Sequence, residues 1–131
     1  MNEGSEITVR VPLSLFGAFR ASAERLGVTT SEAVKILTAA ASWLPPDQLR
    51  SLEEPPQEME TARLSFHLNW NSVDALMITT RNSLLTNSAL FRRLLHGLLV
   101  TKEISFVQQE GQFKLRISSR NNPENTELIA V

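Results

Sequence analysis

Two segments of the chain, offset from each other by 57 residues, contain the same order of structural signals, and their alignment needs no gap. Each segment opens with strict alternation of apolar and polar residues, which predicts a short strand with one buried face. The alternating apolar positions are Ile7, Val9 and Val11 in the first segment and Leu64, Phe66 and Leu68 in the second. Because a segment of about forty residues cannot bury a core alone and a lone strand leaves backbone groups unpaired, we expect the segments to complete each other.

A helical period follows each strand, and Pro12 ends the first strand because it has no N–H to donate. The expected apolar stripes are Phe16, Phe19, Ala23 and Leu26 in the first helix and Val73, Leu76 and Thr80 in its counterpart. Gly27 suits the left-handed residue that ends a helix, whereas Leu84 stands at the equivalent position of the second segment. We expect Ser72 to be the N-cap of the counterpart helix.

A second helix follows in each segment. Thr29 and Glu32 have the spacing of a capping box, and the counterpart helix is expected to begin near residues 86–88. The expected buried positions are Val34, Leu37, Ala41 and Leu44 in the first helix and Phe91, Leu94, Leu95 and Leu98 in the second. Arg92 and Arg93 fall on the opposite face, which we interpret as a solvated face or an interface rather than a DNA contact.

Residues 45–61 join the two segments, hold four of the six prolines and carry a net charge of −4. Proline restricts both its own backbone and the preceding residue, so this stretch is predicted to be a linker, with one short helical turn within residues 47–54. The whole chain has a net charge of −1, so the rest carries an excess of three positive charges, mostly in residues 62–100. Near-neutral net charge is therefore weak evidence against nucleic-acid binding.

The last part of the chain differs from the repeated segments. Residues 104–107 and 113–117 alternate in polarity around Gly111, which predicts a β-hairpin. Residues 121–123, Asn-Asn-Pro, end the hairpin, and residues 126–131 are either a short strand or a loose tail.

Several function classes are excluded by residue content. The chain has no cysteine, so disulfides, thiol catalysis and zinc ribbons are ruled out. His67 and His96 stand alone without an acidic ligand pattern, so we expect no metal and no cofactor. No phosphate-binding loop, nucleophile motif or acid–base pair is present, so we do not expect an enzyme. The absence of a long apolar run and of signal-peptide features predicts a soluble cytoplasmic protein with no membrane partner.

The predicted fold is mainly α with short β. Two strand–helix–helix units, residues 1–44 and 62–100, share a two-stranded antiparallel ribbon and a four-helix core, joined by the linker 45–61. Residues 101–131 add the hairpin and tail. The strands can pair within one chain or be exchanged between two chains, and both arrangements agree with the sequence.

This order of elements resembles the ribbon–helix–helix family of DNA-binding proteins, the Arc and methionine-repressor type. The resemblance covers roughly residues 5–44 and 62–100, so the chain is similar to a tandem, single-chain version of a unit that is normally a homodimer. It is carried by the strands 7–12 and 64–69 and by the helix starts 29–33 and 86–89. Single versions are similar to repressors and antitoxins, and tandem versions to accessory proteins of plasmid transfer or partition.

The resemblance implies roles for particular residues. The ribbon enters the major groove of double-stranded DNA, and its outward side chains read base edges. These side chains are Thr8 and Arg10 from one strand and Arg63, Ser65 and His67 from the other, with Glu6 as a further flanking residue. The starts of the second helices bind phosphates, through Thr29, Thr30 and Ser31 and through Thr86, Asn87 and Ser88. Because the two strands differ, an asymmetric target is expected.

Two functions follow from these observations. The first is double-stranded DNA binding by a transcriptional regulator or a plasmid transfer or partition factor. The second is a protein–protein module on the same scaffold without DNA binding, which the weak positive charge and Glu6 favour. Self-association along DNA, or recruitment of a protein partner by the C-terminal hairpin, agrees with either function.

Overall fold

The computed structural model describes residues 3–109, 112–118 and 126–130. The first unit comprises β1 (Gly4–Pro12), α1 (Leu13–Leu26) and α2 (Thr30–Ser42). A short helix α3 (Pro46–Ser51) follows, and the second unit comprises β2 (Thr61–Asn69), α4 (Trp70–Ser83) and α5 (Asn87–Leu99). The last strands are β3 (Ile104–Gln109), β4 (Gln112–Ser118) and β5 (Thr126–Ala130). This order confirms the two β-α-α units and agrees with a tandem ribbon–helix–helix architecture.

Strands β1 and β2 pair antiparallel within one chain, and their register shows the repeat directly. Thr8 lies opposite Ser65, which is also its equivalent under the 57-residue offset, so this pair marks the centre of the ribbon. The ends of the ribbon are closed by equivalent hydrogen bonds. Leu13 N donates to Glu60 O and Trp70 N donates to Glu3 O, each at 3.1 Å. The two units are therefore related by an approximate two-fold operation about the centre of the ribbon.

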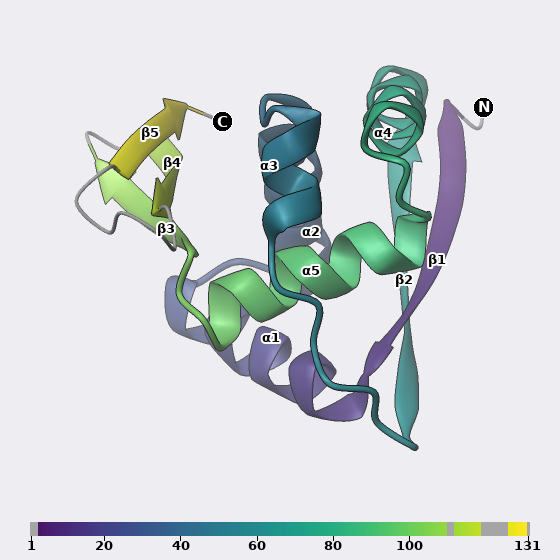
Figure 1. The fold of residues 1–131 in the computed structure, drawn as a ribbon, viewed down its shortest axis with the longest axis vertical. Coiled ribbons are helices and arrows are strands. Elements are labelled where there is room, and N and C mark those ends of the chain that lie inside the picture. Colours follow the sequence, from purple (N-terminus) through teal and green to yellow (C-terminus); the bar gives the residue numbers. More distant parts are fainter. Residues whose placement is uncertain (1–2, 110–111, 119–125, 131) are drawn as a thin grey trace.

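The four long helices lie on one side of the ribbon, and α5 runs from the ribbon into the helical layer (Figure 1). The inward side chains of both strands join the core, whose ribbon members are Val9, Val11, Leu64, Phe66 and Leu68. Phe66 packs on Phe91 of α5 with ring centroids 5.2 Å apart. All the positions predicted to be buried in α2 and α5 are buried. The alternation of the strands and the stripes of these helices thus build one shared core.

The predictions for α1 and α4 were correct in part. Gly27 ends α1 in the left-handed conformation with φ 75°, as expected. The stripe is shifted, because Leu15 is buried while Leu26 is exposed. Ser72 is not the N-cap of α4: the helix begins one turn earlier, where Asn69 Oδ1 accepts a hydrogen bond from Ser72 N at 2.9 Å. Asparagine is as good an N-cap as serine, and the end of the strand selects the earlier residue.

The starts of α2 and α5 follow the sequence signals closely. Thr29 forms the predicted capping box, since its Oγ1 accepts from Glu32 N at 3.1 Å and the Glu32 side chain accepts from Thr29 N. Thr86 caps α5 by accepting from Ala89 N at 3.1 Å. In both helices a threonine therefore satisfies one of the N–H groups of the first turn.

The acidic segment between the units is packed rather than extended through solvent. The predicted helical turn is present as α3, and Leu49 and Leu52 are buried in the shared core. Two leucines thus anchor a segment whose prolines and charges indicated only a linker.

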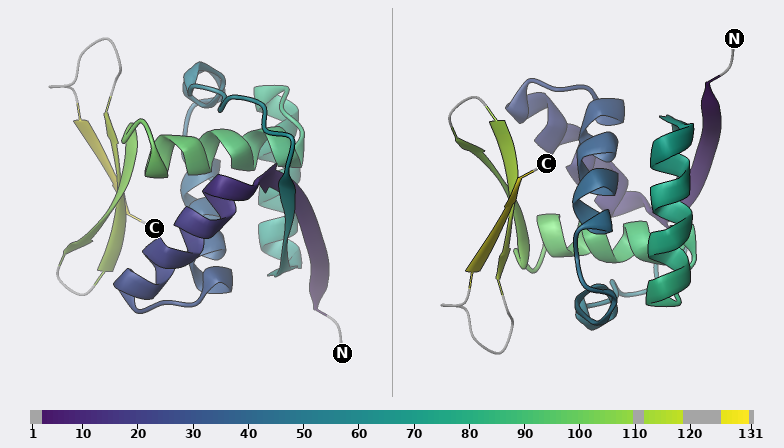
Figure 2. Two further views of the ribbon diagram at one scale, coloured as in Figure 1. Left: turned by 90° about the horizontal axis from the view of Figure 1, so that it is seen from below. Right: turned by 90° about the horizontal axis from the view of Figure 1, so that it is seen from above.

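The predicted C-terminal hairpin is confirmed by the pairing of β3 with β4, and β5 extends it to a three-stranded antiparallel sheet. The residues predicted to turn and end it, Gly111 and 121–123, lie outside the described residues. This sheet lies at the far end of α5, on the opposite side of the helical layer from the β1–β2 ribbon (Figure 2). Among the described residues, no helix has the length and hydropathy needed to cross a bilayer.

Candidate nucleic-acid interface

The ribbon turns six polar side chains away from the core. We call this set the outer ribbon face; it comprises Glu6, Thr8, Arg10, Arg63, Ser65 and His67, and all six residues are exposed. The strict alternation of the two strands places these residues on the face opposite the buried apolar residues. All five residues predicted to read bases therefore lie together on one surface.

The centre of the outer ribbon face is small and uncharged. Thr8 and Ser65 lie opposite each other, and their hydroxyl oxygens are 3.0 Å apart in a hydrogen bond. Each hydroxyl both donates and accepts hydrogen bonds, so the pair retains capacity for an external partner. The centre thus offers adaptable polar groups without a bulky side chain above them.

The two ends of the outer ribbon face carry different charges. Arg10 lies opposite Arg63 at one end, and Glu6 lies opposite His67 at the other. In a ribbon made of two identical strands, both ends would carry the same pair. Here the repeat places Arg63 at the position equivalent to Glu6, so positive charge gathers at one end.

At the arginine end, a side-chain hydrogen bond joins the two strands of the ribbon. Arg10 Nη1 donates to Thr61 Oγ1 at 3.2 Å, which orients the guanidinium along the neighbouring strand. Arginine presents five donors in a planar fork, so this single bond leaves most of them available. The guanidinium of Arg10 is therefore partly pre-oriented and still able to bind a paired acceptor.

Three of the predicted phosphate-binding residues use their side chains in hydrogen bonds within the protein. The hydroxyls of Thr29 and Thr86 cap their own helices. Ser88 Oγ accepts from Arg10 N at 3.1 Å, which ties the start of α5 to the edge of β1. The first-turn N–H groups left without intrahelical partners are those of residues 30–31 in α2 and 87–88 in α5.

The basic residues of α5 are partly buried against the linker, which agrees with the interface that was one of the two roles expected for them. The Arg92 side chain is 31% exposed and pairs with Glu54 at 3.1 Å. Arg93 is 18% exposed, pairs with Glu54 at 3.5 Å, and donates to Arg50 O at 2.9 Å and Leu52 O at 2.6 Å. The linker thus compensates one of the two positive charges with Glu54, and these arginines form an internal interface.

The same contact includes a buried histidine that the sequence did not associate with the linker. His96 Nε2 donates to Glu53 Oε2 at 2.9 Å, and the His96 side chain is only 6% exposed. The acidic residues of the linker and the basic residues of α5 are about forty positions apart, so no local sequence pattern predicts their contact. Their opposite charges were the signal in the sequence that agreed with it. Glu53 and Glu54 are therefore structural partners that sequence reasoning missed.

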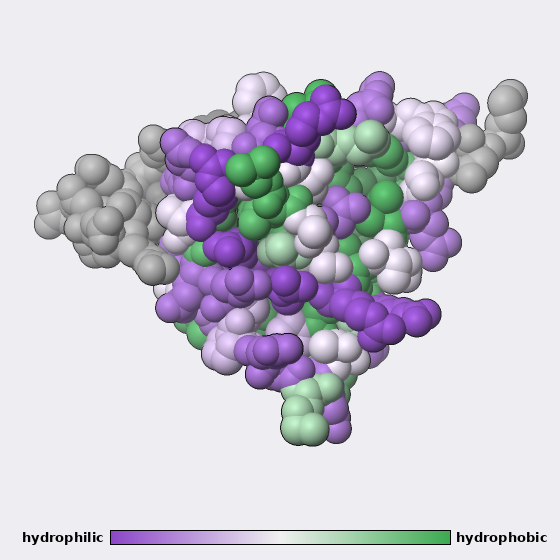
Figure 3. Space-filling view, turned by 45° about the vertical axis from the view of Figure 1, so that its right-hand side comes forward, coloured by the Kyte–Doolittle hydropathy of each residue, from purple (hydrophilic) through white to green (hydrophobic). Residues whose placement is uncertain are grey.

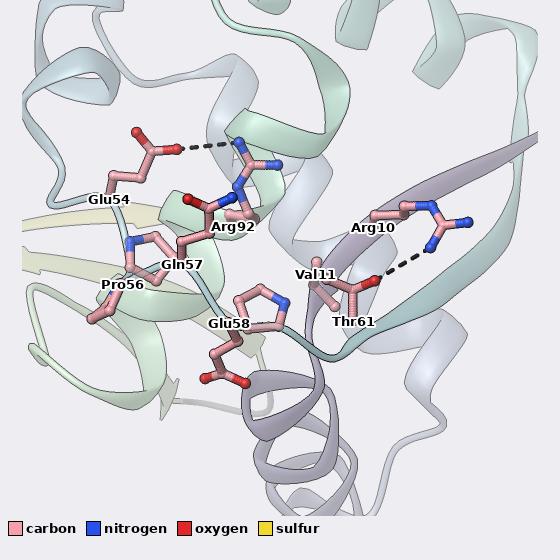
Figure 4. Close-up of a pocket in the computed structure, with 10 residues that line it drawn as sticks. Arg10, Val11, Glu54, Pro56, Gln57, Glu58, Thr61 and Arg92 are labelled. Carbon is pink, nitrogen blue, oxygen red and sulfur yellow. Dashed lines mark hydrogen bonds and ion pairs between the residues drawn. The ribbon is translucent and has the colours of Figure 1, made fainter.

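A pocket of about 700 Å³ separates the linker from the arginine end of the ribbon (Figure 4). Arg92 and Glu54 pair on one wall, and Arg10 and Thr61 on the other. The carboxylate of Glu58, also in the lining, accepts hydrogen bonds from the backbone N and the hydroxyl of Ser14. The Glu54 carboxylate is thus paired with an arginine and the Glu58 carboxylate accepts two hydrogen bonds, whereas the exposed Glu60 beside Thr61 adds a negative charge near the arginine end.

Comparison with protein-family models, curated proteins and solved structures gave no significant match for this chain.

Proposed function

We propose that the protein binds double-stranded DNA by placing the outer ribbon face in the major groove. The observation that carries this proposal is the ribbon itself: a two-stranded antiparallel pair, covered by helices on one face, with six exposed polar side chains on the other. A two-stranded ribbon fits the width of the major groove. Hydroxyl and guanidinium groups are suited to the donors and acceptors displayed there.

The difference between the ribbon ends supports an asymmetric target. Arg10 and Arg63 lie opposite each other, and arginine pairs bidentately with guanine O6 and N7. Glu6 at the other end repels phosphate and accepts from cytosine amino groups. We therefore expect guanines under the arginine end of the target and a different sequence under the Glu6 end.

Backbone groups supply a second, sequence-independent contribution. The unpaired N–H groups at the starts of α2 and α5 carry partial positive charge and are suited to phosphate oxygens. The link between Ser88 and Arg10 holds the start of α5 beside the ribbon. Only one net positive charge remains on the outer ribbon face when His67 is neutral, so we expect modest affinity and a shallow dependence of affinity on salt.

The test is fluorescence anisotropy of a labelled random-sequence duplex pool and of duplex from upstream of the protein's own gene. Binding should weaken between about 50 mM and about 200 mM salt, with the shallow slope expected for few neutralised phosphates. The double variant Arg10→Ala with Arg63→Ala should weaken binding by at least about tenfold, because each bidentate contact is worth about 1–3 kcal/mol.

The matched control is Arg25→Ala with Lys35→Ala, which removes the same charge from exposed positions on α1 and α2. It should change affinity by less than about twofold if the ribbon makes the contact. Absence of duplex binding at low salt, or an equal loss in the two double variants, would overturn the proposal.

The second candidate is a protein-interaction module without DNA binding. The contacts of Arg92 and Arg93 with Glu54 of the linker favour it, because these contacts reduce the availability of both arginines for phosphate. Binding of no duplex, with retention of the folded structure, is the result that would select this candidate.

A further inference from the structure

Helix α4 exposes an apolar face that its counterpart α1 does not have. The exposed fractions of Trp70, Met77 and Ile78 are 55%, 54% and 55%, and Leu84 in the turn after the helix is 83% exposed. Positions 70, 74, 77, 81 and 84 are three or four residues apart and therefore lie along one face of the helix, and position 78 lies beside this face. Figure 3, which brings the α4 side of the molecule forward, shows hydrophobic side chains exposed among polar ones.

Apart from Leu13, which is equivalent to Trp70 and 44% exposed, the equivalent positions of α1 are small or charged. Arg20 and Ala21 stand where α4 has Met77 and Ile78, and Glu24 stands where α4 has Arg81. The Arg20 guanidinium lies 5.7 Å from the centre of the Phe16 ring and so covers an apolar group on its own helix. The apolar face is therefore a property of the second unit and not a consequence of the fold.

Two charged residues flank the centre of the α4 face at equal distances. Asp74 precedes Met77 by three positions and Arg81 follows Ile78 by three positions. Both charged residues are exposed, and neither has a hydrogen bond or ion pair within the described part of the chain. A pattern that reads the same in both directions, with opposite charges at its two sides, is complementary to itself.

We propose that α4 binds α4 of a second copy of this chain in an antiparallel, two-fold symmetric pair. Centring the pair between Met77 and Ile78 places Met77 of each copy against Ile78 of the other. The same operation sets Asp74 against Arg81 twice and brings Trp70 over the Leu84 turn. Such an interface is isologous, so it closes at two copies, and α1 offers no similar face to extend the assembly.

The size of the face sets the expected strength. A single helix pair lies at or below the low end of stable interfaces, about 1,000–1,200 Å² in total, so we expect a dissociation constant in the micromolar range. The pairing involves no residue of the outer ribbon face. It is therefore independent of DNA binding, and each proposal can fail without the other.

Sedimentation velocity of the full chain across a range of about 1–500 μM, without DNA, tests the proposal. We expect a reversible monomer–dimer equilibrium. Asp74→Arg alone and Arg81→Asp alone should each weaken dimerisation by at least about tenfold, because each creates two like-charge contacts. The double variant Asp74→Arg with Arg81→Asp restores both pairs and should return the dissociation constant to within about threefold of the original.

The matched control is Glu24→Arg, a charge reversal at the α1 position equivalent to Arg81, which should leave the equilibrium unchanged. Ile78→Asp should abolish the dimer, and circular dichroism of every variant reports whether the helices are retained. A chain that is monomeric throughout, a dimer insensitive to the α4 variants, or single variants that dissociate without rescue by the double would each overturn the proposal.

Discussion

The two β-α-α units share a fold but complete it with different means. The helix after β2 begins at Asn69, which caps it with its own side chain. The equivalent residue in the first unit is Pro12, which has no capping group, and Glu58 of the linker supplies the acceptor for the first turn of α1. In the second unit the linker instead pairs Glu54 with the two arginines of α5. Each unit therefore depends on the same connecting segment, for a different physical need.

The largest expected effect lies at the contact between the linker and α5. Arg93→Ala removes donors to two backbone carbonyls from a side chain that is 18% exposed, so we expect a loss of about 2–3 kcal/mol in the free energy of unfolding. Arg92→Ala, at 31% exposure and with a single ion pair, should cost less than about 1 kcal/mol. Urea unfolding of both variants measures the difference, and equal losses would contradict the distinction.

A smaller effect is expected at the starts of α1 and α4. Asn69→Ala removes an N-cap within its own helix and should cost about 1 kcal/mol. Glu58→Ala removes a cap supplied across the chain by an exposed carboxylate, and we expect about half that loss because ordering the linker side chain costs entropy. Guanidinium unfolding curves at neutral pH compare the two, and a larger loss for Glu58→Ala would show that the first unit relies on the linker more than its neighbour does.

The remaining comparison concerns the turns after α1 and α4, where the two substitutions change stability in opposite directions. Leu84 adopts φ 61° where Gly27 has φ 75°, and the left-handed conformation costs a residue with a side chain about 1 kcal/mol. Leu84→Gly should therefore raise the free energy of unfolding by about 0.5 kcal/mol, and Gly27→Ala should lower it by about 1 kcal/mol. Thermal unfolding at a concentration well below the dissociation constant of the proposed α4 pair gives both signs. A destabilising Leu84→Gly would mean that the Leu84 side chain contributes to the monomer.

How far the sequence predicted the molecule depends on how local each interaction is. The period of two in the strands and the capping signals at Thr29 and Thr86 act over a few residues, so the ribbon and the helix starts were predictable. The same alternation predicted that Thr8, Arg10, Arg63, Ser65 and His67 share a surface. The capping role of Asn69 was missed because this residue both ends β2 and caps α4. The left-handed conformation of Leu84 was not predicted because it opposes the local preference of a residue with a side chain, which the surrounding fold overrides.

The contacts of the linker were not predictable in the same way. Glu54 meets Arg92 and Glu53 meets His96 across about forty positions, and no periodic pattern encodes such pairs. Proline content indicated an extended connection, whereas two buried leucines determine its path. The charge distribution showed a negative excess in residues 45–61 and a positive excess in residues 62–100, but it did not show which residues pair.

Pairing β1 with β2 inside one chain has a kinetic consequence. The connecting segment keeps the two strands at an effective concentration of roughly millimolar, which no ordinary dilution changes. Folding of the ribbon and its core is then a first-order process with a rate independent of protein concentration, and its midpoint is independent of concentration below the dissociation constant of the proposed α4 pair. Dilution can separate two whole molecules but cannot take a ribbon apart, so every molecule retains a complete outer ribbon face at the lowest concentrations.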